Sequence, residues 1–202
     1  MLFQLHFTIE FQGRLWYNAT ISKEGSYKKN VDAFDYAGVL CKALRRGVLL
    51  TTRSGDQVNT MTIGWGGIGV EWGKPVFIAY VRESRYTKRL LEESGEFTVN
   101  VPLSDDYQDI LGYCGTKSGR DTDKIRDKNL ITVESDVVSA PGIVQFPLTL
   151  ECRVIYRQEQ EIRQMPQGVV NRFYPPFGET KVPDMHTAFY GEIVNAYLIE
   201  QD

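Results

Sequence analysis

The chain has 202 residues, of which 42% are hydrophobic and 24% charged, and its formal net charge is −3. A chain of this length is expected to fold as one domain around its own core, without needing disulfides or a structural metal. Because 23 basic side chains stand against 26 acidic ones, we expect no basic field on the surface and no nucleic-acid partner.

Reactive side chains are few and far apart in the sequence. The two histidines and three cysteines form no CxxC or HExxH motif, which excludes structural zinc and dithiol redox chemistry. Lone thiols are typical of a reducing compartment, so we expect a cytoplasmic protein. No apolar stretch approaches the roughly 20 residues that span a bilayer, so we expect no membrane partner.

Residues 1–30 are predicted to form an N-terminal extension, and residues 31–202 the domain proper. Apolar and polar side chains alternate over residues 3–11, which is a strand pattern and not the continuous apolar core of a signal peptide. A polar run at 22–26 separates this stretch from the predicted domain. The extension is either an added edge strand or an upstream stretch included by a misplaced start, and the sequence leaves both interpretations open.

A helix followed by a hairpin opens the domain. The helix is predicted from Asp32 to a stop at Gly47. Its apolar face has side chains spaced three to four residues apart, namely Phe34, Ala37, Leu40 and Leu44. Residues 48–53 and 57–64 then have strand composition and are separated by a Ser-Gly-Asp turn, which predicts a β-hairpin.

Short strands and helices alternate irregularly in the middle of the chain. Three strands are predicted, at 66–71, 76–81 and 97–101. A helix over 87–94 would be capped by Thr87 and ended by Gly95. A further helix is expected to end near Tyr113, before a polar loop at 115–121.

Two long strands are predicted late in the chain, at 148–156 and 187–200. The second has apolar residues on both faces, with Phe189, Ile193 and Tyr197 on one and Tyr190, Val194 and Leu198 on the other, so it is expected inside the fold. The Pro-rich connection at 158–184 is long enough to favour a lid or binding loop. Together the elements predict a mainly β fold, a β-barrel decorated with helices.

Two segments bear on phosphate binding. Residues 64–69 match GxGxxG, but β-like Val70 follows where a helix should begin, so a dinucleotide fold is rejected and the glycines remain as places where a ligand could approach the backbone. Residues 81–87 join a strand to a helix and carry groups suited to phosphate, namely Arg82, Ser84, Arg85 and Thr87. A solvated loop with an ordinary helix cap is the commoner meaning of such a segment.

Five further residues stay open between a structural and a functional role. Lys117 and Ser118 offer more donors, although a plain surface turn explains them as well. His186 is either structural or an acid, a base or a ligand contact at the start of the last strand. Trp65 is more often a core residue than a stacking platform, and Cys114 has no neighbouring base, so we interpret it as inert.

Four sequence blocks occur in a fixed order, 47–52 (GVLLTT), 58–65 (VNTMTIGW), 81–87 (VRESRYT) and 95–102 (GEFTVNVP). They resemble the flavin reductase-like family with the FMN-binding split barrel, and in particular its flavoredoxin-like members. The blocks CGTKSG at 114–119 and HTAFYGEI at 186–193 extend the resemblance over about 31–200. It implies a Greek-key-like split β-barrel that is homodimeric and binds one FMN per subunit near the dimer interface.

The resemblance also implies roles for the candidate residues. Those expected along the isoalloxazine ring are Asn59, Met61, Thr62 and Trp65. Those expected at the phosphate are Ser84, Arg85 and Thr87, with Arg82 as a helper. Lys117 and Ser118 would approach the flavin from their loop. His186 is the catalytic candidate, as a contact of flavin or nicotinamide.

The implied function is that of an FMN-dependent oxidoreductase. NADH, NADPH or a redox partner protein would reduce the bound FMN, and the electrons would pass to a second flavin, a protein or a small acceptor. A flavoredoxin-type electron carrier and a non-catalytic flavin-binding or sensory barrel remain as alternatives. The sequence shows no separate nicotinamide motif, as expected if the nicotinamide stacks over the flavin.

Overall fold

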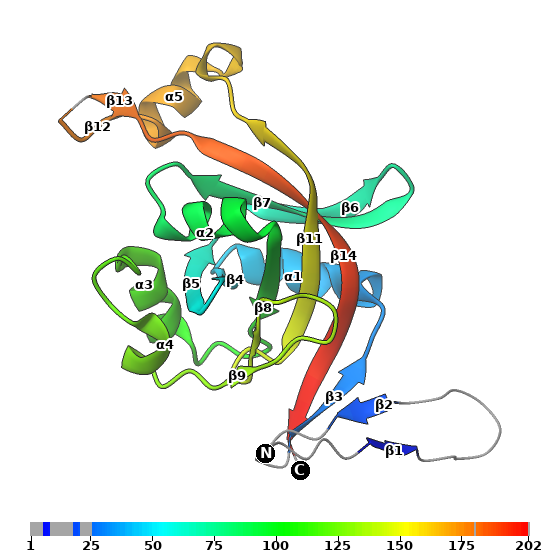
Figure 1. Cartoon of the computed structure of the whole chain (residues 1–202). Helices are drawn as coiled ribbons and strands as arrows, with labels where there is room; N and C mark the ends of the chain where they lie inside the picture. Colours follow the sequence, from blue (N-terminus) through cyan, green and yellow to red (C-terminus); the bar gives the residue numbers. More distant parts are fainter. Residues whose placement is uncertain (1–5, 9–17, 21–25, 180, 202) are drawn as a thin grey trace.

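The computed structural model describes residues 6–8, 18–20, 26–179 and 181–201 (Figure 1). The larger part of the predicted strand at 3–11 lies outside these residues. The strands are β1 (His6–Thr8), β2 (Asn18–Thr20), β3 (Ser26–Asn30), β4 (Val48–Ser54), β5 (Gln57–Ile63), β6 (Gly66–Glu71), β7 (Lys74–Arg82), β8 (Glu96–Val101), β9 (Thr132–Val133), β10 (Gly142–Ile143), β11 (Leu148–Glu159), β12 (Pro176–Phe177), β13 (Val182–Pro183) and β14 (His186–Gln201). The helices are η1 (Ala33–Tyr36), α1 (Ala37–Leu44), α2 (Tyr86–Ser94), α3 (Gln108–Thr116), α4 (Lys124–Asp127), η2 (Ile162–Gln164) and α5 (Gln167–Phe173).

An antiparallel sheet of eight strands forms the centre of the fold. Its order is β5-β4-β8-β11-β14-β7-β6, and β3 pairs with the last part of β14. β11 and β14 form a long ribbon that runs the length of the molecule, and the segment with α5, β12 and β13 sits at one end of it (Figure 1). The predicted mainly β fold is confirmed.

The core shows that the sheet curves around its own interior. One cluster joins side chains from α1 and from β4, β5, β7, β8, β11 and β14. Val48 and Leu50 of β4 belong to this cluster, whereas Leu49 between them belongs to a second cluster with Leu111 of α3. Since neighbouring residues of a strand face opposite sides, β4 is buried on both faces, by the barrel interior and by α3.

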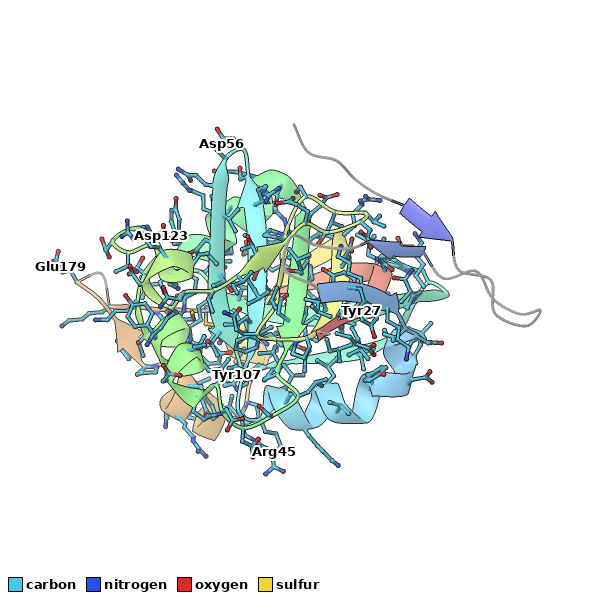
Figure 2. The ribbon with its side chains drawn as sticks, turned by 90° about the horizontal axis from the view of Figure 1, so that it is seen from below. Tyr27, Arg45, Asp56, Tyr107, Asp123 and Glu179 are labelled. Atoms are coloured by element: carbon cyan, nitrogen blue, oxygen red, sulfur yellow. The ribbon has the colours of Figure 1, made fainter. Side chains whose placement is uncertain are left out.

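Helices α3 and α4 lie beside the β4–β5 hairpin. Figure 2 shows this from below, with Asp123 labelled at the start of α4 and Asp56 at the hairpin turn. Arg45 lies at the other end of this view, where α1 ends. Within the part of the chain that the structure describes, no helix is long and apolar enough to cross a membrane.

Most predicted elements are confirmed, and two details are wrong. In the first helix Phe34 is 43% exposed, and Ala33 beside it is buried instead, because the first turn is a 3-10 turn capped by Asp32 and not α-helix. The residue before α2 is Arg85 in extended conformation, so Thr87 is not the cap but the second helical residue. The stop at Gly95 is confirmed, with a left-handed φ of 68°.

Three further predictions can be compared with the structure. The helix expected to end near Tyr113 continues to Thr116. β14 is central as predicted, since it pairs with β7, β11 and β3. The glycine-rich strand is β6, and a Cβ at Gly66 would lie 2.7 Å from the carbonyl oxygen of Ile78, so this glycine is required by β7 and not by a ligand.

The predicted boundary between residues 30 and 31 stays a prediction. Ser26–Asn30 nevertheless form strand β3, paired antiparallel with Tyr197–Gln201 of β14. The last five residues of the predicted extension therefore belong to the same sheet as the domain.

Candidate functional site

A cavity of about 200 Å³ opens where β5 leads into β6. Among the predicted site residues it is lined by Met61, Thr62, Trp65, Arg82, Arg85 and His186. These residues come from three separate segments, 61–65, 82–85 and His186, and the pairing of β7 with β14 sets Arg82 directly opposite His186. The structure thus brings together most of the candidates from distant parts of the sequence.

Asn59 and Thr87 meet next to this cavity. The Asn59 Nδ2 atom donates to Thr87 Oγ1 over 2.7 Å, and both side chains are buried. A Cβ at Gly119 would lie 2.3 Å from Asn59 Oδ1, so the loop after α3 closes directly over this pair. Asn59 and Thr87 therefore join β5 to the first turn of α2.

The start of α2 has the features of an anion site. No side chain caps its first turn, which leaves N–H groups at the positive end of the helix dipole. Ser84, just before it, donates its backbone N–H and its hydroxyl to the two carboxylate oxygens of Asp184, over 2.9 and 2.7 Å. Ser84 therefore already holds an anionic group with two donors.

The two arginines of this segment have different partners. The Arg85 Nη1 atom donates to the carbonyl of Gly115 over 2.8 Å, and burial lowers the pKa of Arg85. Arg82 donates to the carbonyls of Asp184 and Phe173 over 2.7 and 3.0 Å. Arg85 is thus set beside the helix terminus, whereas Arg82 holds the connecting segment at the end of α5 and just before β14.

Lys117 and Ser118 do not line this cavity. Lys117 follows α3 directly and its side chain is exposed. Ser118 Oγ accepts from the backbone N–H of Arg120 over 3.2 Å, and Arg120 in turn donates to the carbonyl of Ser84 over 3.1 Å. The predicted loop therefore contacts the site through Arg120 and Gly119, which the sequence did not indicate.

His186 is buried among aromatic rings. Its ring centroid lies 4.7 Å from that of Trp65, and Trp65 also meets Phe173 edge-on at 5.2 Å. Burial, and after it the charge of Arg82, lowers the pKa of His186 to about 4. The imidazole is therefore neutral at neutral pH, and it is not a proton donor of the imidazolium type there.

The protonated nitrogen of His186 can be assigned from its hydrogen bonds. The Tyr174 hydroxyl donates to Gln160 Oε1 over 2.7 Å and lies 2.9 Å from His186 Nδ1. Because the phenol has one proton and gives it to Gln160, its oxygen accepts from Nδ1–H. His186 is thus left with Nε2 as a hydrogen-bond acceptor.

Three residues of the site carried no signal in the sequence. Tyr174 and Asp184 lie in the irregular connection, and Asp184 reaches a partner 100 residues earlier in the chain. Lys124 follows a polar loop but is only 4% exposed, and its Nζ donates to the carbonyls of Thr60 and Cys114 over 3.0 and 2.9 Å. Each depends on a tertiary contact that no local pattern encodes.

A second cavity of about 420 Å³ adjoins the first. The two share Gly64, Trp65 and Tyr80 in their linings. The second is lined further by Cys41 of α1 and by Arg45 directly after it, among others. A flat ligand at Trp65 would therefore have open space beside it, where a second molecule can approach.

Cys114 agrees with its predicted inertness. It is fully buried, and burial raises the pKa of its thiol. A thiol held neutral in this way is a poor nucleophile.

Residues 43–202 match the family model of the flavin reductase like domain. An uncharacterized protein of Archaeoglobus fulgidus is 34% identical over 104 residues, which are 52% of this chain and 58% of that protein, so this chain spans less than two thirds of that relative. Flavoredoxin of Desulfovibrio vulgaris (Miyazaki F) is similar in structure, with 27% identity, a TM-score of 0.57, and coverage of 77% of this chain and 69% of that one.

The fold is also similar to that of a Shewanella frigidimarina NCIMB 400 protein with a split barrel domain, at a TM-score of 0.58 and 14% identity over 83% of this chain and 75% of that one. The predicted split β-barrel is therefore confirmed. The family match covers most of the chain, and all residues that line the first cavity lie within the matched range. The chain therefore belongs to the flavin reductase-like family, whose members are in general flavin-binding oxidoreductases.

Proposed function

We propose that the first cavity binds FMN and that the protein passes electrons from NADH, NADPH or a redox partner through this FMN to an acceptor. The observation that carries the proposal is the meeting of an aromatic cavity at Trp65 with an uncapped helix start flanked by Ser84 and Arg85. When bound, the flavin supplies the redox chemistry. The chain's own residues have to bind it, orient it and tune its surroundings.

The residues divide into a phosphate end and a ring end. At the phosphate end, Arg85 and the first turn of α2 offer positive charge and N–H donors, and Ser84 offers a hydroxyl once Asp184 leaves it. At the ring end, Met61 and Trp65 provide the apolar wall. His186 contributes an acceptor at Nε2, so we assign it a ligand-contact role and no proton transfer.

The proposal has three further parts. We infer a homodimer, because the β6–β7 hairpin exposes Trp72 and Val70 at 65% each, and exposed apolar groups of this size mark interaction surfaces. Lys117 and Ser118 remain flavin contacts only if their loop moves toward the cavity. Free buried thiols at Cys114 and Cys152 support a reducing compartment such as the cytoplasm.

The test compares FMN with riboflavin, which lacks the phosphate. Changing Arg85 to Ala should weaken FMN by at least about tenfold and riboflavin much less, because charge-assisted hydrogen bonds to the phosphate are lost. Fluorescence titration of the purified protein measures both affinities. Arg126→Ala, at a largely exposed arginine on α4, is the matched control and should change neither.

Two outcomes would contradict parts of the proposal. Equal weakening of FMN and riboflavin would remove Arg85 from the phosphate, and no binding of FMN at saturation would remove the flavin site itself. Anaerobic addition of NADH or NADPH to the FMN-loaded protein separates the alternatives. Rapid loss of the flavin's visible absorption supports a nicotinamide-dependent reductase, whereas slow loss with both favours an electron carrier or a non-catalytic barrel.

A further inference from the structure

Lys124 is a buried cation without a carboxylate partner among the described residues. It is 4% exposed, and its Nζ donates to two neutral groups, the carbonyls of Thr60 on β5 and Cys114 on α3. Burying an ammonium group in this way is unfavourable, and two carbonyls compensate only in part. The structure therefore carries a positive charge at a place where the apo protein does not neutralise it.

A second cation meets the same turn. Arg85 donates to the carbonyl of Gly115, one residue after the carbonyl that receives Lys124. Cys114 and Gly115 lie in the last turns of α3, where the carbonyls form the negative end of the helix. Lys124 thus fixes this turn against β5, and the turn in turn fixes Arg85 at the edge of the first cavity.

The charges around Arg85 do not balance. Arg82 lies close enough for its charge to lower the pKa of Arg85, and the one carboxylate that raises it, Asp184, is bound to Ser84. Arg82 and Lys124 therefore both lie near Arg85, and Asp184 is the carboxylate that acts on it. A doubly negative ligand would restore the balance, whereas an uncharged one would not.

Each element packed against Lys124 contributes to its protonation. Burial lowers the pKa of Lys124 to about 8, and the charge of Arg85 lowers it further; Cys114 on α3 raises it only in the thiolate form. β5 brings only the neutral Thr60 carbonyl. The Cys114 thiol is itself neutral at pH 8, because burial raises its pKa.

We propose that Lys124 is a positioning residue for the doubly charged phosphate of the flavin, holding the turn that places Arg85 and taking up a proton when the phosphate binds. This rests on the proposed function and deepens it. The site then prefers a flavin with a doubly charged phosphate monoester over an uncharged flavin. The charge responsible is that of Lys124, which does not itself contact the phosphate but lies next to the residues that do. FMN affinity should fall as the pH rises through 8, while riboflavin affinity stays level.

The test is calorimetric titration of the purified protein with FMN at pH 8, in two buffers of different protonation enthalpy. The wild-type protein should take up a measurable fraction of a proton on binding, because part of Lys124 is neutral there. Lys124→Arg should keep the affinity, lose the uptake and lose the dependence on pH. Lys124→Met should lose the uptake and weaken FMN by about tenfold, with riboflavin nearly unchanged.

Two controls make the readout specific to Lys124. Lys128→Met removes a lysine four residues away, 3.2 Å from Asp109, and should leave the uptake unchanged. Cys114→Ser should also leave the uptake, since the thiol is neutral throughout. Thermal unfolding of each apo variant shows whether it is folded. If Lys124→Met does not fold, Lys124→Arg still tests the inference.

Each remaining outcome overturns the inference. If the wild type binds FMN without proton uptake, or if Lys124→Arg retains the uptake, Lys124 is not the group that titrates. If Lys124→Met weakens FMN and riboflavin equally, the lysine serves packing alone. A wild-type protein that binds no FMN overturns the proposed function as well, and this result is distinct because in the other three outcomes the wild type still binds FMN.

Discussion

Asp184 places a carboxylate on the donors that the proposed function reserves for a phosphate. The Ser84 N–H and hydroxyl both bond to it, at 2.9 and 2.7 Å. A phosphate that binds these donors must displace this carboxylate and is repelled by it if it stays near. Asp184 therefore competes with the phosphate for the two donors of Ser84.

Changing Asp184 to Asn should raise the affinity for FMN by about threefold to tenfold, because the neutral amide competes less and does not repel the phosphate. Riboflavin affinity should not change. Fluorescence titration measures both, with Asp121→Asn in the polar loop as the control. Weaker FMN binding in Asp184→Asn would show instead that this carboxylate supports the site.

At the scale of elements, local pattern was a good guide wherever it reported burial. Strand β4 and its hairpin partner β5 are expected from apolar and β-branched runs around a turn, and the structure has them within one residue of the prediction. The predicted cap of α2 is wrong. Threonine is a residue type that often caps helices, but the Thr87 side chain lies inside the fold and accepts a hydrogen bond from Asn59. Composition does not say which way a side chain points.

The sequence predicted which residues belong to the candidate site better than it predicted which partners they contact. Trp65, Arg85 and His186 were identified from blocks of sequence, and the pairing of β14 with β7 brings His186 beside the segment that carries Arg85. The partners of Arg82 and the burial of Lys124 were not predictable, since both depend on segments packed from elsewhere in the chain. Tertiary contacts of this kind produce no periodic pattern of residues in the local sequence.

Arg82 holds the segment that carries α5 to the barrel at two points. Arg82 donates to the carbonyl of Phe173 at the end of α5 and to that of Asp184 just before β14. Helix α5, which ends at the first of these points, has no buried residue, whereas Tyr174 directly after it is buried. An element with few buried contacts opens more readily than the core, so these two hydrogen bonds from a charged donor contribute to its order.

Changing Arg82 to Ala should therefore speed amide hydrogen exchange in residues 160–184 by about tenfold or more, because two bonds from a charged donor are lost. Exchange in β4 and β8 should stay as in the wild type. Mass spectrometry of the exchanged peptides measures both regions. Arg157→Ala, at an exposed arginine of β11, is the matched control, and equal exchange in the two variants would contradict the role given to Arg82.

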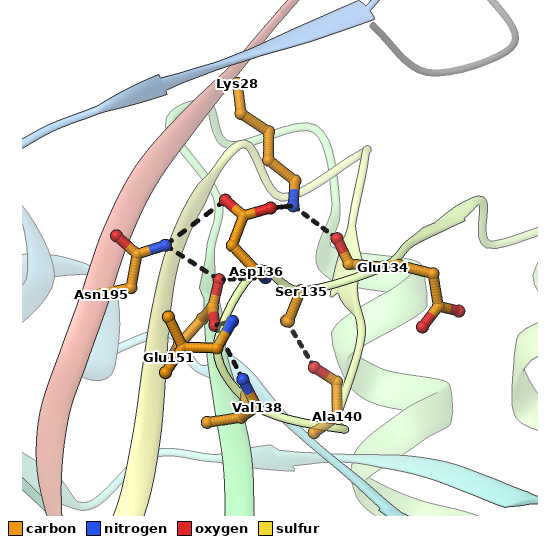
Figure 3. A network of polar contacts seen from close by, with 9 residues as sticks. Lys28, Glu134, Ser135, Asp136, Val138, Ala140, Glu151 and Asn195 are labelled. Atoms are coloured by element: carbon orange, nitrogen blue, oxygen red, sulfur yellow. Dashed lines mark hydrogen bonds and ion pairs between the residues drawn. The ribbon is translucent and has the colours of Figure 1, made fainter. Parts of the chain in front are cut away.

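At the scale of the whole molecule, strand β3 is joined to the barrel by a buried polar network (Figure 3). Lys28 reaches from β3 to the Asp136 carboxylate at 2.8 Å and to the Glu134 carbonyl. Glu151 of β11 is fully buried and accepts from the backbone N–H groups of the same loop, while Asn195 of β14 donates to it over 3.0 Å. Three strands and one loop thus meet at this network.

Changing Lys28 to Met should lower the free energy of unfolding by about 1–3 kcal/mol, because the loop loses a buried charged donor and Asp136 loses its partner. Lys29→Met is the matched control, since Lys29 is the neighbouring residue, is exposed, and is 3.8 Å from Glu200; it should change stability by less than about 0.5 kcal/mol. Urea unfolding measures both. Flavin affinity should be unchanged in both variants, because β3 pairs with the end of β14 remote from His186. Equal stabilities would make β3 an appendage, as the predicted boundary at residue 31 has it, whereas a loss in Lys28→Met alone would extend the folding unit back to Ser26.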